Sequence, residues 1–147
     1  MSATTERPAS LAIDDVAVGD ALPELAVEVT ATMVIGAAIA SRDFEPVHHD
    51  RDAARAAGLP DIFLNILTTN GLVVRLVTDW AGPEAIVRKS DIRLGVPHCA
   101  GQRLTLTGEV AAVELDRRLV TVAVRGRNDG GEHVTGIVEV DLPGGDG

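Results

Sequence analysis

The sequence is 147 residues long and 46% hydrophobic, which is enough for one domain with its own core. We expect this single domain over residues 1–147, with loose ends at about 1–10 and 143–147. A formal net charge of −9 disfavours duplex nucleic acid and anionic membranes as partners, because both repel an acidic surface. A single cysteine, Cys99, and the lack of a signal peptide or membrane-spanning apolar run predict a cytoplasmic protein.

Three helical segments are expected in the first half of the chain. Residues 31–42 carry apolar side chains at helical spacing, and Thr30 before them has the side chain of an N-cap. A short Ala-rich segment, residues 50–57, begins with Asp50 as its N-cap and ends before Gly58.

The third segment, residues 65–81, is apolar on nearly every side, which is typical of a buried helix. Gly82-Pro83 predicts its end. Gly71 lies in its interior, where glycine costs about 1 kcal/mol relative to alanine. We therefore expect a close backbone approach at Gly71.

The second half changes from a helical to an alternating period. Residues 104–110, 120–124 and 134–140 alternate apolar with polar side chains, which predicts strands with one buried face. Residues 128–131, Asn-Asp-Gly-Gly, predict a hairpin turn, and an earlier strand is expected at about 86–94.

An antiparallel sheet with one apolar face must cover that face, and the apolar helix is the natural cover. We therefore predict an α+β protein with a hotdog fold, in which an antiparallel β-sheet wraps around a central buried α-helix.

The connection between the first two helices concentrates polar groups. Asp43 and His48 are five positions apart there, which is about 17 Å in an extended chain. Pro46 interrupts helical structure and imposes a turn, which can bring both side chains to one pocket. A carboxylate beside an imidazole suits general acid/base chemistry. The alternative, still open at this point, is that Asp43 caps a helix and His48 lies on the surface.

The segment from Ser41 to Asp50, S-R-D-F-E-P-V-H-H-D, resembles the S-G-D-x-N-P-x-H-x-D signature of the MaoC-like (R)-specific enoyl-CoA hydratases. Residues 92–97, with Gly101 following, resemble a second motif of that family. The resemblance implies the hotdog fold and the addition of water to an α,β-unsaturated acyl-CoA. It also implies that Asp43 and His48 are the catalytic acid/base pair.

Further segments resemble the small subunits of actinobacterial steroid side-chain hydratases in this family, among them residues 61–63, 65–68 and 77–83. This resemblance implies a steroid substrate, a 3-oxo-pregnadiene-carboxyl-CoA. It implies a larger MaoC-like subunit as partner in a hetero-oligomer, with self-association as the alternative. Neither a metal nor a cofactor is expected, apart from the coenzyme A of the substrate.

The family pattern also implies substrate-binding residues. A backbone N–H near Leu64 and Asn65 stabilises the thioester oxygen, and Arg93 contacts the phosphates of coenzyme A. For Arg93 an exposed charged strand face is an open alternative. The sequence departs from the family at Leu64-Asn65, where many members have His-Gly, and at Glu45, where most have Asn.

Two other functions remain to be weighed. A hotdog acyl-CoA thioesterase needs an acidic residue on the central helix, and this helix offers only Asp79, near its far end. A non-catalytic subunit that only forms a substrate tunnel is the second, and the presence of both Asp43 and His48 argues against it.

Overall fold

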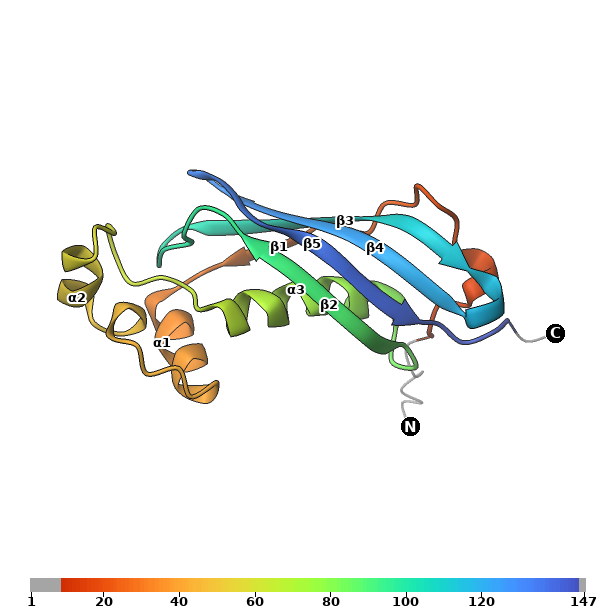
Figure 1. Ribbon diagram of the computed structural model, residues 1–147, viewed down its shortest axis with the longest axis horizontal. Helices are drawn as coiled ribbons and strands as arrows, with labels where there is room; N and C mark the ends of the chain where they lie inside the picture. The colour runs from red at the N-terminus through yellow and green to blue at the C-terminus, as the bar shows by residue number, and fades with distance from the viewer. Residues whose placement is uncertain (1–8, 146–147) are drawn as a thin grey trace, which may run out of the picture.

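The computed structural model describes residues 9–145 (Figure 1). Most of the predicted N-terminal loose end, residues 1–8, and the last two residues, 146–147, lie outside the described part of the chain.

The strands form one antiparallel sheet in the order β1-β3-β4-β5-β2, so that β1 and β2 are its edges (Figure 1). The alternation of apolar residues predicted this meander, because one face of each strand packs on the core. The strands are β1 (Leu25–Glu28), β2 (Ile86–Leu94), β3 (Arg103–Glu114), β4 (Leu119–Asn128) and β5 (Gly131–Asp141).

Helix α3 (Ile66–Ala81) runs along one face of the sheet (Figure 1). Helices α1 (Ala31–Ala40) and α2 (Arg51–Ala56) lie beyond one end of the sheet, on the side where α3 begins. The predicted α+β architecture, an antiparallel sheet around a central helix, is confirmed. The N-terminal end of α3 meets α1 and the loop that follows α1. The candidate site lies at this end.

The core is the apolar layer between α3 and the sheet. Leu76 and Val77 of α3 are almost completely buried, as are Leu106 and Val122 of the central strands. Burial of such a side chain contributes about 1.5–3 kcal/mol, so this layer supplies most of the stability of the domain. Across residues 9–145 no helix has both the length and the apolar character needed to cross a membrane.

The N-caps predicted for the first two helices are confirmed. Thr30 Oγ1 accepts the Met33 N–H, and Asp50 Oδ1 accepts two N–H groups at the start of α2. The first helix ends at Ala40 rather than residue 42. Strand β1 was missed, because its four residues are too few for an alternating pattern to stand out.

Two expectations about α3 were wrong. Its first turn is not buried within this chain, since Ile66 and Leu67 are about half exposed at 51% and 53%. A Cβ added at Gly71 would meet nothing within 4 Å, so no backbone of the described chain approaches it. The sheet covers one face of α3 and leaves the other open.

A buried histidine lies in the loop between β2 and β3. The ring of His98 is fully buried, with Nε2 donating to Gln102 O (3.3 Å) and Nδ1 accepting from Asn128 Nδ2 (3.2 Å). Burial, and secondly the nearby His133, lower the pKa of His98 to about 4. The neutral ring has one N–H donor and one acceptor nitrogen, which match Gln102 O and Asn128 Nδ2 respectively.

The neighbouring His133 on β5 is bound in the same way. Its Nδ1 donates to Val96 O (2.7 Å), and its Nε2 accepts from Thr69 Oγ1 of α3 (2.9 Å). Burial lowers the pKa of His133 as well. The two rings, with centroids 5.3 Å apart, tie the loop before β3 to the sheet and to α3.

We predict that acid destabilises the domain through this pair. Unfolded His98 takes up a proton near pH 6.5 whereas the folded state does so only near 4, so stability falls as the pH drops through that window. The loss from His98 is up to roughly 1.4 kcal/mol per pH unit. Urea unfolding at pH 7, 6 and 5 measures it. The decrease of the unfolding free energy with falling pH should be smaller in His98→Gln than in wild type. The control His49→Gln changes an exposed ring and should keep the wild-type pH dependence. The same pH dependence in all three proteins would contradict the prediction.

Candidate functional site

The loop after α1 begins with a tight helix end that directs Asp43. The N–H of Asp43 donates to Ala38 O (2.9 Å), and the N–H of Arg42 donates to Ile39 O (3.0 Å). Arg42 has a φ of 58°, in the left-handed region where helices usually end on glycine. The chain reverses at this point, and Asp43 faces back toward the start of α3.

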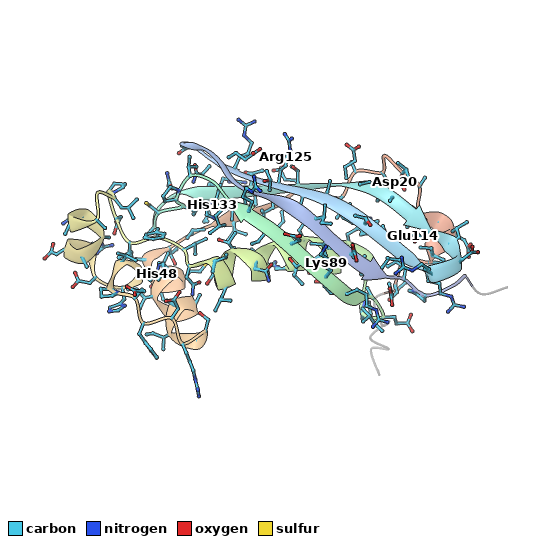
Figure 2. The ribbon with its side chains drawn as sticks, in the orientation of Figure 1. Asp20, His48, Lys89, Glu114, Arg125 and His133 are labelled. Carbon is cyan, nitrogen blue, oxygen red and sulfur yellow. The ribbon has the colours of Figure 1, made fainter. Side chains whose placement is uncertain are left out.

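Pro46 begins a single turn of 3-10 helix that carries His48 (Figure 2). The ring of His48 is buried, and its Nδ1 donates to Phe63 O (2.8 Å). The Phe63 ring meets it edge-on at a centroid distance of 4.7 Å. The carbonyl fixes the proton on Nδ1, so Nε2 is the nitrogen available for chemistry. The turn predicted at Pro46 is confirmed.

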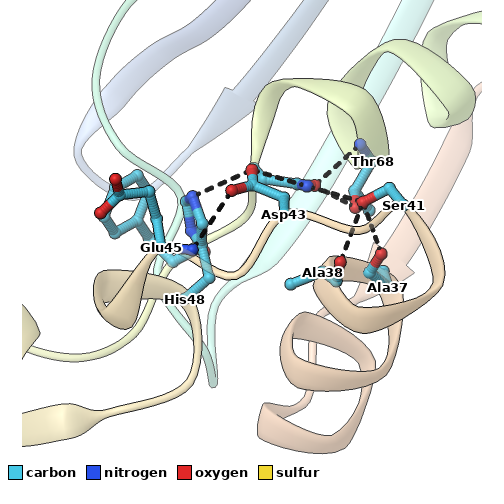
Figure 3. Close-up of polar contacts among 9 residues, drawn as sticks. Ala37, Ala38, Ser41, Asp43, Glu45, His48 and Thr68 are labelled. Carbon is cyan, nitrogen blue, oxygen red and sulfur yellow. Dashed lines mark hydrogen bonds and ion pairs between the residues drawn. The ribbon is translucent and has the colours of Figure 1, made fainter.

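The two predicted catalytic side chains are in contact (Figure 3). His48 Nε2 lies 3.4 Å from Asp43 Oδ2, and the Asp43 side chain is 25% exposed while that of His48 is 9% exposed. An ionised carboxylate accepts protons, and the imidazole holds or releases one at Nε2. A small molecule that reaches the Asp43 carboxylate therefore meets a base and an acid side by side.

Asn65 holds the Asp43 carboxylate in place through its side chain. Its Nδ2 donates to Asp43 Oδ2 (3.0 Å) and to Ser41 Oγ (2.9 Å). Its Oδ1 accepts the Thr68 N–H (3.0 Å), which caps α3. The sequence indicated only a backbone role for Asn65. Its position just before an apolar helix was a signal for capping, but not for a bond to a residue 22 positions earlier.

The backbone N–H groups at the start of α3 differ in whether they already donate a hydrogen bond within the chain. The Leu64 N–H donates to His98 O (2.9 Å) and is occupied. Within residues 9–145, the Asn65 and Ile66 N–H groups have no acceptor. The first turn of a helix also carries partial positive charge. Of the two predicted residues, Asn65 thus offers a free N–H, whereas Leu64 does not.

Arg93 does not join this site. It is exposed on β2, and its neighbour Ile92 packs on the core, so Arg93 points to the outer face of the sheet. His49, next to His48, is exposed. The side chain of Glu45 is also exposed, and its N–H lies 3.4 Å from Asp43 Oδ1.

The fold has counterparts among known proteins. The MaoC like domain family matches residues 17–130, and the chain belongs to this family. The (R)-hydratase from A. caviae involved in PHA biosynthesis is 26% identical and superposes with a TM-score of 0.81, covering 88% of this chain and 98% of that one.

More similar is the beta subunit of the 3-oxo-4,17-pregnadiene-20-carboxyl-CoA hydratase of Mycobacterium tuberculosis. It is 52% identical over 125 residues, which covers 85% of this chain and 95% of the relative. A chain of the crystal structure of the ChsH1-ChsH2 complex from the same organism is also 52% identical. It superposes with a TM-score of 0.83, covering 86% of this chain and 98% of that one.

We predict that the Asn65 amide stabilises the site as well as the helix. Asn65→Asp keeps the cap oxygen but sets a second carboxylate against Asp43, so it should lower the free energy of unfolding at pH 7 by about 1–3 kcal/mol. Urea denaturation measures this loss. Asn70→Asp is the control, because Asn70 on the same helix accepts a hydrogen bond from Ser90 through its side-chain oxygen, which aspartate retains. Wild-type stability in Asn65→Asp would show that the bond to Asp43 contributes nothing.

Proposed function

We propose that this chain is the catalytic subunit of an enoyl-CoA hydratase, a hydro-lyase that adds water to an α,β-unsaturated acyl-CoA. The observation that carries the proposal is the contact between Asp43 and His48 at 3.4 Å. Membership of the MaoC like family and the two hydratase relatives support it. The reaction needs no cofactor beyond the coenzyme A of the substrate, and the expectation of no metal stays a prediction.

The proposed mechanism uses one water between the two side chains. The double bond is conjugated to the thioester, so its β-carbon is electrophilic. Asp43 accepts a proton from the water as the oxygen attacks this carbon. Protonated His48 gives the proton on Nε2 to the α-carbon. The proton on Asp43 then returns to His48 across their contact, which restores both groups.

The thioester oxygen gains negative charge during the attack and needs a donor. The N–H of Asn65, at the start of α3, is the proposed donor, together with the partial positive charge of the helix terminus. The Leu64 N–H has no such part, because His98 O accepts it. The outward position of Arg93 gives no support to its predicted contact with coenzyme A phosphates.

The proposed acyl group is a steroid side chain, a 3-oxo-pregnadiene-carboxyl-CoA. The support is the 52% identity to the beta subunit of a hydratase named for that substrate. The same relative supports a hetero-oligomer, since a chain equally similar to this one was solved in a two-protein complex. We therefore propose a larger MaoC-like subunit as partner, with self-association as the alternative.

The other two functions have weaker support. A thioesterase would need Asp79 at the site, yet Asp79 accepts a hydrogen bond from Arg75 (3.2 Å) near the opposite end of α3. A subunit without catalysis would have no need for a buried imidazole held by Phe63 O against a carboxylate.

Replacing either member of the pair should abolish most of the activity. Asp43→Asn, which keeps the shape, and His48→Ala should each lower kcat by about 10²–10⁴-fold, the usual effect of losing one acid/base group. Spectrophotometric hydration of an enoyl-CoA by the purified complex measures it. The matched controls are Asp52→Asn and His49→Ala, both at exposed positions, which should stay near wild type. Near-normal turnover in Asp43→Asn or His48→Ala would reject the assignment.

Co-expression with candidate larger MaoC-like subunits tests the partner and the acyl group. We expect co-purification of one such subunit, and faster hydration of the steroid enoyl-CoA than of crotonyl-CoA. A complex that prefers short linear substrates would rule out the steroid assignment. A chain that is fully active alone would rule out the need for a partner.

A further inference from the structure

A shallow, open apolar groove lies between α1 and α3, beside the hydrogen-bond network that holds Asp43. Its volume is about 370 Å³, within the usual range for small-molecule sites. Ala37 and Ala40 of α1 form one side, and Leu67 and Gly71 of α3 form the other. Most of the wall is therefore apolar, and Ser41 and Thr68 contribute its two hydroxyl groups.

Ser41 and Thr68 line the groove and also belong to the network that holds Asp43. Ser41 Oγ donates to Ala37 O (2.8 Å), and Thr68 Oγ1 donates to Asn65 Oδ1. Both protons are therefore used within the chain. Ser41 and Thr68 each hydrogen-bond to Asn65, the residue that positions Asp43. An apolar group in the groove would therefore contact two residues that bind Asn65 directly.

No contact within residues 9–145 requires a glycine at position 71 of α3. A Cβ at this position would meet no atom within 4 Å, and an interior glycine weakens a helix relative to alanine. Its effect is to deepen the groove. This space is available to something from outside the chain.

We propose that this groove binds the fused rings of the acyl group, and that Gly71 sets the room available to them. The inference rests on the proposed function. In a 4,17-pregnadiene-20-carboxyl thioester the reacting β-carbon is itself a ring atom. The rings must then lie close to the catalytic pair, and this groove adjoins the hydrogen-bond network that holds Asp43. A larger hollow of about 990 Å³ lies over the outer face of the sheet, lined by charged residues such as Glu109 and Arg125, and suits rings less well.

Filling the groove tests the proposal. Gly71→Leu, in the complex with the larger subunit, should lower kcat/KM for the steroid enoyl-CoA by about 10–100-fold while crotonyl-CoA changes less than about threefold. Gly71→Ala should give a smaller loss. The matched control is Gly36→Leu, because Gly36 is an interior glycine of α1 whose Cβ also meets nothing within 4 Å and which does not line the groove.

A binding measurement separates this proposal from the proposed function. Calorimetry with the saturated steroid acyl-CoA, which cannot be hydrated, should show weaker binding to Gly71→Leu than to wild type or Gly36→Leu. This result would support the groove even if wild type hydrated neither substrate, which would defeat only the proposed function. Unchanged binding and kinetics in Gly71→Leu would overturn the groove assignment, as would equal losses on both substrates. Loss of the larger subunit from Gly71→Leu on size exclusion would overturn it too, because the groove would then be a subunit contact.

Discussion

The side-chain amide of Asn65 joins the fold to the candidate site, and the position of Asp43 beside His48 depends on it. The amide oxygen caps α3, while the amide nitrogen donates to Asp43 and to Ser41. Since α3 is fixed by its packing against the sheet, Asn65 ties Asp43 and the loop after α1 to a rigid element. Asp43 is thereby held at a defined distance from His48, as general acid/base chemistry requires.

His48 has a separate support on its other side. Its Nδ1 donates to Phe63 O, and Phe63 pairs with Cys99 in an isolated antiparallel bridge. The next N–H along the chain, that of Leu64, donates to His98 O. His98 is itself buried and fully hydrogen-bonded. The imidazole of the pair is thus braced from the loop before β3 and the carboxylate from the start of α3, so the two groups meet where these elements converge.

The same end of the molecule carries exposed apolar side chains. The sheet buries one face of α3 but leaves Ile66 and Leu67 about half exposed, next to the groove and to the catalytic pair. The free face of α3 is the kind of surface that the proposed apolar substrate and the proposed second subunit would each need. Phe44, one residue after Asp43, is also exposed, at 65%. The proposed chemistry and the proposed recognition therefore both use this end of the domain.

The sequence by itself determined most of the helices and strands, and it identified Asp43 and His48 as the candidate pair. Periodicity, caps and turn residues act over a few positions, so the central helix, the long strands and the turn at Pro46 could be read locally. Only the tertiary structure decided the short strand β1, the outward position of Arg93 and the side-chain role of Asn65. Asn65 and Asp43 are 22 positions apart, and their contact exists only because α3 packs on the sheet and presents its first turn to the loop. Contacts over such separations depend on how all the elements pack together, which no local pattern records.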